Sequence, residues 1–186
     1  MIKVDAQLLQ ILQDYIQFMD SEKTTNLPVV ISEHKNNHPS SLYSNSIVYS
    51  SFSFGNTCLD CEIRNRDTYD YSFQIRSDRL KKQVVLRFDE GQAAHRNDIP
   101  GIPLDQQCVT TPHFHKYNSD GYLVAYKTLN LEKASQLPLS IEEGFDLFLN
   151  EANICDEGID PRIQITKNGN ILINLQQIDP LAEINF

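Results

Sequence analysis

The spacing of apolar residues along the chain changes from helical to alternating and back to helical. The first apolar residues recur every three or four positions: Leu8, Leu12, Tyr15, Ile16 and Met19. This spacing predicts one amphipathic helix that is capped by Asp5 and ends near Asp20. Residues 21–45 are polar and contain two prolines, so we expect a loop there, with one short edge strand at 27–31.

Strict alternation of apolar and polar residues then predicts an antiparallel sheet. The alternating segments are 46–54, 59–64, 69–76 and 83–89. A period of two is the signature of a half-buried strand. In the last segment Arg87 and Asp89 fall on the face opposite Leu86 and Phe88. We therefore expect an apolar face turned to the core and a polar face that carries these two charges.

A long loop over 90–110 precedes two further strands, at 111–117 and 122–127. On the first of these strands, four polar side chains share one face: Thr111, His113, His115 and Tyr117. Phe114 takes the other face, toward the core. The two histidines are therefore expected to project together.

The C-terminal part predicts a helix and a hairpin. Ser140 and Glu143 have the spacing of a capping box at the start of the helix. Asn168-Gly169 is a strong turn signal between strands 162–166 and 171–175. The predicted fold class is α+β, a mostly antiparallel β-meander with an N-terminal helix, a second helix after the sheet and a C-terminal hairpin. We expect a single domain over 1–186, with its core at 46–130 and the helix plus hairpin at 140–176.

Composition narrows the class of protein. The chain has 186 residues, 40% of them hydrophobic and 22% charged, which is typical of a globular domain. With no long apolar run and no signal-peptide layout at the N-terminus, we expect a cytoplasmic protein without a membrane segment. The net charge of -9 disfavours a general nucleic-acid binder but allows an enzyme with a local basic pocket, or a protein that docks onto a basic partner.

Cysteine spacing offers one alternative site. Cys58 and Cys61 form a C-x-x-C pair, but they lie in an alternating segment that turns residues three apart to opposite faces. We expect buried thiols there rather than zinc ligands.

Histidine density marks the candidate site. Three of the five histidines, His95, His113 and His115, fall within one window of the chain. They could bind zinc together and activate water. Alternatively, without a cofactor, His95 and His113 could act as an acid–base pair on RNA while His115 assists. A third interpretation is a polar cluster that only stabilises the fold.

Other polar residues in the window complete the candidate site. In the metal-free mechanism Arg87 and Arg96 bind the phosphate, because a guanidinium matches phosphate geometry. The remaining candidates for binding or orienting a substrate are Asp89, Asn97, Thr111 and Tyr117.

These motifs also resemble those of known proteins. The order Arg87-Phe88-Asp89, His95-Arg96-Asn97 and Thr111-Pro112-His113-Phe114-His115 resembles a group of small bacterial proteins of unknown function with the pattern R-F-D, H-R-N and T-P-H-x-H. It is similar, more distantly, to TumE-like proteins, which are regarded as toxins of toxin–antitoxin pairs. In this chain Glu90-Gly91 follows the aspartate, where the TumE-like pattern has Asn-Ala.

Two functional hypotheses follow. The first is a toxin-like ribonuclease or related small hydrolase, with RNA as a substrate and an antitoxin as a protein partner. The second is a non-enzymatic acidic protein, an inhibitor or accessory subunit of a mobile-element or defence system, with structural histidines and a basic protein partner. The catalytic hypothesis requires His95 to lie within about 8 Å of His113, because a water-bridged contact cannot reach farther.

Overall fold

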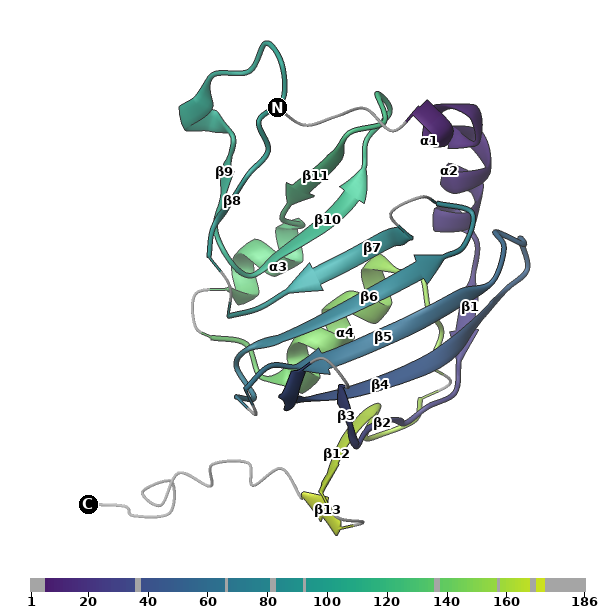
Figure 1. The fold of residues 1–186 in the computed structure, drawn as a ribbon, viewed down its shortest axis with the longest axis vertical. Coiled ribbons are helices and arrows are strands. Elements are labelled where there is room, and N and C mark those ends of the chain that lie inside the picture. Colours follow the sequence, from purple (N-terminus) through teal and green to yellow (C-terminus); the bar gives the residue numbers. More distant parts are fainter. Residues whose placement is uncertain are drawn as a thin grey trace.

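The computed structural model describes residues 6–35, 38–65, 67–80, 83–91, 93–135, 138–156, 158–167 and 170–172 (Figure 1). The helices are α1 (Ala6–Gln10), α2 (Leu12–Asp20), α3 (Leu129–Ala134) and α4 (Ile141–Glu151), with a short 3-10 helix η1 (Leu104–Gln106). The strands are β1 (Lys23–Thr25), β2 (Val29–Ile31), β3 (Glu33–Lys35), β4 (His38–Ser50), β5 (Thr57–Ile63), β6 (Tyr71–Ser77), β7 (Val84–Asp89), β8 (His95–Arg96), β9 (Cys108–Val109), β10 (His113–Tyr117), β11 (Leu123–Tyr126), β12 (Ile163–Lys167) and β13 (Asn170–Leu172). The predicted α+β class is confirmed.

The main sheet is an antiparallel meander. Its strand order is β1-β4-β5-β6-β7-β10-β11, and β3 also pairs with β4. A second sheet has the order β13-β12-β2, and its β12–β2 pair is parallel. A two-stranded hairpin, β8–β9, lies beyond β10 and β11 (Figure 1). The meander therefore runs as the alternating pattern predicts, and the hairpin is the part that the sequence pattern does not show.

Helix α4 covers the apolar face of the main sheet (Figure 1). The ring of Phe73 on β6 lies 5.0 Å from that of Phe145 and 5.6 Å from that of Phe148, between ring centroids. Gly144 allows a close approach, because a Cβ at this position would lie 2.2 Å from the Tyr71 hydroxyl oxygen. The predicted capping box at Ser140 begins this helix.

Helix α2 is bonded to the far end of the β7–β10 ladder. These strands pair as far as Lys116 opposite Leu86. One step further, the Tyr15 hydroxyl donates to the Val85 carbonyl at 2.9 Å and accepts from the Tyr117 N–H at 3.1 Å. The hydroxyl thus satisfies backbone groups that the ladder leaves unpaired.

The N-terminal part differs from the sequence prediction. Ile11 interrupts the predicted helix with φ −120° and ψ 15°, so two helices replace one. The predicted loop over 21–45 is wrong, since β1, β2, β3 and the first half of β4 lie there. The edge strand expected at 27–31 is present as β2. The proposed Asp5 cap, the Asn168-Gly169 turn and residues 173–176 lie outside the described residues.

Cysteine side chains follow the predicted alternation. Cys58 pairs with Arg76 and Cys61 with Phe73 on the neighbouring strand, so the two thiols lie on opposite faces of the sheet. All four cysteines are free, and only Cys61 is buried.

Candidate metal centre

Strands β7 and β10 place two histidines beside a carboxylate and a guanidinium. His113 lies opposite Asp89 and His115 opposite Arg87 in the antiparallel register. Cross-strand neighbours share one face of a sheet, so these four side chains project together. Phe114 and Phe88 pair on the other face, with ring centroids 5.0 Å apart. The predicted separation of polar and apolar faces is confirmed.

The third histidine reaches the cluster from the β8–β9 hairpin. His95 pairs with Val109, and Arg96 pairs with Cys108. The Asn97 side chain fastens this hairpin to β11 because its Nδ2 donates to the Ala125 carbonyl at 2.8 Å and its Oδ1 accepts from the Ala125 N–H at 2.6 Å. Ala125 lies opposite His115 in the sheet. The latch therefore holds His95 beside the histidines of β10.

The three imidazole rings converge. Ring centroids are 4.7 Å apart for His113 and His115, 4.8 Å for His95 and His115, and 6.0 Å for His95 and His113. The last distance is well inside the limit of about 8 Å that a water-bridged contact sets. The structure therefore meets the distance condition that the sequence analysis set for His95.

Asp89 is the buried anion of the cluster. Its side chain is only 2% exposed, and its Oδ1 accepts from Arg87 Nε at 3.0 Å and Arg87 Nη2 at 2.8 Å. Its Oδ2 lies 3.4 Å from His115 Nε2. Burial alone would raise the pKa of Asp89, but His115 and Arg87 outweigh burial and hold this pKa below its usual range. The carboxylate is therefore ionised and has one oxygen turned to the histidines.

Arg64 is a neighbour of this carboxylate that the sequence did not predict. Its Nη1 lies 3.9 Å from Asp89 Oδ1, and its Nε bonds Asp70 at 2.6 Å. It also donates to the backbone carbonyls of Tyr71 and Glu90. Arg64 follows the end of β5, so only the strand order brings it near β7.

Three of these residues have the donor set of a metal site. Asp89, His113 and His115 each offer one ligand atom, and these atoms lie within 4.8 Å of one another. All three residues are buried. Asp89 Oδ2 and the two imidazoles are ligands that zinc and other divalent transition metals accept.

Burial favours the uncharged form of two of the site histidines, His95 and His113. Burial, reinforced by the neighbouring His115, lowers the pKa of His113 from 6.5 to about 4, while Asp89 and the Thr110 backbone oppose the shift. Burial also lowers the pKa of His95. The buried His113 Nδ1 makes no hydrogen bond of normal geometry within the described part of the chain. Neutral imidazoles are the form that ligates a metal.

The other predicted site residues lie at the margins. Arg96 is exposed on the hairpin. Thr111 is half-buried, and its Oγ1 has no hydrogen-bond partner among the described residues. The Tyr117 ring packs edge-on against Tyr15, with centroids 5.8 Å apart, at the α2 end of the strand.

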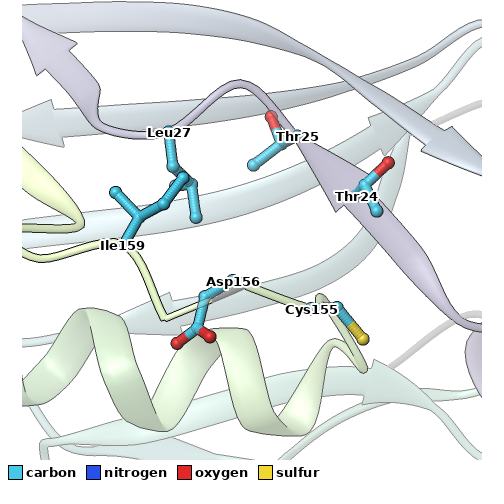
Figure 2. A pocket seen from close by; sticks show the side chains of 6 residues that line it. All are labelled: Thr24, Thr25, Leu27, Cys155, Asp156 and Ile159. Carbon is cyan, nitrogen blue, oxygen red and sulfur yellow. The ribbon is translucent and has the colours of Figure 1, made fainter.

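A separate pocket of about 110 Å³ lies between β1 and the segment after α4 (Figure 2). Its lining residues are Thr24, Thr25, Leu27, Cys155, Asp156 and Ile159. Leu27 and Ile159 face each other across it (Figure 2). None of the clustered histidines lines this pocket, so it is distinct from the candidate metal centre.

Comparisons with known proteins add no assignment. Models of protein families, curated proteins and solved structures were all searched, and none matches the chain. Among the described residues, no helix combines the length and the apolar character needed to cross a bilayer.

Proposed function

We propose that this protein is a metal-dependent hydrolase whose ion is held by Asp89, His113 and His115. The supporting observation is the 3.4 Å separation of Asp89 Oδ2 and His115 Nε2. Good hydrogen bonds between nitrogen and oxygen span about 2.7–3.2 Å, so this contact is long for one. Two ligands of one tetrahedral zinc, with bonds of about 2.0–2.1 Å, lie about 3.4 Å apart.

The charge state of the imidazoles favours the metal over the metal-free mechanism. An acid–base pair acting at neutral pH needs one protonated histidine to serve as the acid. Burial lowers the pKa of both His95 and His113 and therefore disfavours the protonated form of each ring. The same neutral rings are suited to ligation. RNA cleavage by His95 and His113 without a metal is therefore the less supported mechanism.

A bound zinc ion would supply a water of lowered pKa as the nucleophile. Arg87 would keep Asp89 in place, since two of its nitrogens bond Oδ1 and leave Oδ2 for the ion. The Arg87 side chain is 35% exposed, so its remaining N–H groups can meet an anionic substrate. We therefore propose phosphodiesters, RNA among them, as the first substrate class to test.

The cellular role that fits this chemistry is that of a bacterial toxin. We propose that the protein cleaves RNA in the cytoplasm and that a basic antitoxin neutralises it. Two features support this role: the R-F-D, H-R-N and T-P-H-x-H motifs, and the net charge of -9, which favours a basic partner.

Metal content and chelation test the proposal. The wild-type protein, incubated with zinc and dialysed, should retain one ion per chain, and His113→Ala and Asp89→Asn should retain far less. RNA cleavage and growth inhibition should disappear with the chelator and in His113→Ala. His38→Ala is the matched control, because His38 is exposed on β4, three strands from β7. Cleavage that persists in excess chelator would point to the metal-free mechanism.

A second candidate has its own supporting observation. His113 and Asp89 are each only 2% exposed, and buried polar clusters can fix a fold without catalysis. The protein would then be an acidic inhibitor or accessory subunit that binds a basic protein. Reversing the charges of Asp156 and Asp160 should abolish capture of that partner, whereas His113→Ala should leave capture intact if the protein still folds.

A further inference from the structure

The position of His95 relative to His113 and His115 fits a shared ion. An imidazole bound to zinc has its ring centroid about 3.2 Å from the ion, given a bond of about 2.0–2.1 Å. Two such rings at a tetrahedral angle lie about 5.2 Å apart, centroid to centroid. The three rings here are 4.7, 4.8 and 6.0 Å apart, which brackets that value.

We propose that His95 is the fourth metal ligand, so that metal binding fastens the β8–β9 hairpin over the site. This inference rests on the proposed metal centre and adds its regulation. His95 is the one candidate ligand that lies outside the main sheet, since Asp89 is on β7 and His113 and His115 are on β10. A ligand on a separate hairpin can join or leave while the other three stay in place.

Hydrogen bonds within the hairpin hold it together as one unit. Gln107 is only 3% exposed and braces the hairpin from within. The Gln107 side-chain amide donates to the backbone carbonyls of Ile99 at 3.1 Å and Ile102 at 2.7 Å. The Gln107 backbone carbonyl accepts from the Asn97 N–H at 3.0 Å. The Asn97 side chain ties the hairpin to the sheet through its two hydrogen bonds to the Ala125 backbone. His95 would add a second attachment through the ion.

Ligand number then decides what the site can do. With His95 bound, zinc has four protein ligands, which is the closed arrangement of a structural site. With His95 released, three ligands remain and the fourth position can take water, as in catalytic zinc sites. Movement of the hairpin would therefore switch the site between a resting and a hydrolytic state.

Zinc titration combined with hydrogen exchange tests this inference. In the wild type, zinc should slow amide exchange across 93–111 by about tenfold or more, because closure suppresses local opening. In His95→Ala the zinc affinity should fall by about tenfold or more, and zinc should no longer protect 93–111. His38→Ala is the matched control, since His38 is an exposed histidine on β4, outside the hairpin, and this variant should keep the zinc affinity and the protection of the wild type.

The outcomes separate the two proposals. If the wild type binds no zinc, the metal centre and this inference both fail. If His95→Ala binds zinc with unchanged affinity and keeps the protection, the metal centre stands and the role of His95 is refuted. His95→Gln, checked for folding by circular dichroism, repeats the test with a larger polar side chain. Restoration of affinity in His95→Ala by free imidazole would support direct ligation.

Discussion

Replacing Asn97 with alanine should weaken the fold through one defined pair of contacts. The variant removes two hydrogen bonds to the backbone of Ala125, one of 2.8 Å and one of 2.6 Å. Ala125 is 3% exposed, so its N–H and carbonyl lose their partners with little access to water. An unsatisfied buried polar group costs about 1–3 kcal/mol. With two such groups, the expected loss in the free energy of unfolding is about 2–6 kcal/mol.

Urea unfolding followed by far-UV circular dichroism measures this loss. The matched control is Asn45→Ala, because Asn45 is exposed on β4 and its amide donates to the Asp60 carboxylate at 2.6 Å, where water can replace it. That variant should lose less than about 1 kcal/mol. Asn97→Asp should resemble Asn97→Ala, since the carboxylate keeps the Ala125 N–H bond but faces the Ala125 carbonyl without a proton to donate. Equal midpoints for Asn97→Ala and Asn45→Ala would refute the latch.

Four further outcomes are expected. Because burial lowers the pKa of His113 from 6.5 to about 4, the fold favours the neutral ring. The stability of the metal-free protein should hold above about pH 6.5 and fall between pH 6.5 and 4, with up to about 3 kcal/mol of that fall due to His113, and urea titrations of His113→Gln should lack this part of the dependence. Asp89→Asn leaves two guanidiniums without their buried anion and should cost about 3 kcal/mol at pH 7 in the same assay; an unchanged midpoint would contradict the ion-pair assignment. Gly144→Ala should destabilise by about 1–3 kcal/mol in thermal melts despite the better helix propensity of alanine, because the new Cβ would meet the Tyr71 hydroxyl, and a rise in Tm would contradict that packing. Ser140→Ala should cost about 1 kcal/mol in urea unfolding by removing the capping box of α4, and no loss would argue against that cap.

Alternation along the chain was enough to predict the faces of the meander. On β7 and β10 it separated Phe88 and Phe114 from Asp89 and the two histidines, because a strand alternates whatever its neighbours are. The capping box likewise predicted the start of α4, since capping depends on residues that are close in sequence. Local rules therefore predicted the elements that carry two of the three histidines.

Pairing over long distances explains what the sequence could not show. The first half of β4 is rich in serine and has weak strand propensity, and its pairing with β5 makes it a strand. The two-residue strands β8 and β9 are too short to have a pattern, so the approach of His95 was a hypothesis rather than a derivation. Arg64 has no local signal at all, because its contact with Asp89 crosses from β5 to β7. The predicted site thus lacked its hairpin latch and its second guanidinium.

The Tyr15 hydroxyl has a consequence for the order in which the chain folds. Its two bonds span 70 and 102 residues of sequence. Contacts of such separation carry a large loop-closure entropy and form late in folding. During synthesis α2 emerges before the strands of the sheet, yet it cannot make both bonds until residue 117 has left the ribosome. Docking of α2 and pairing of β7 with β10, the strand that carries His113 and His115, should therefore occur together as a single late event.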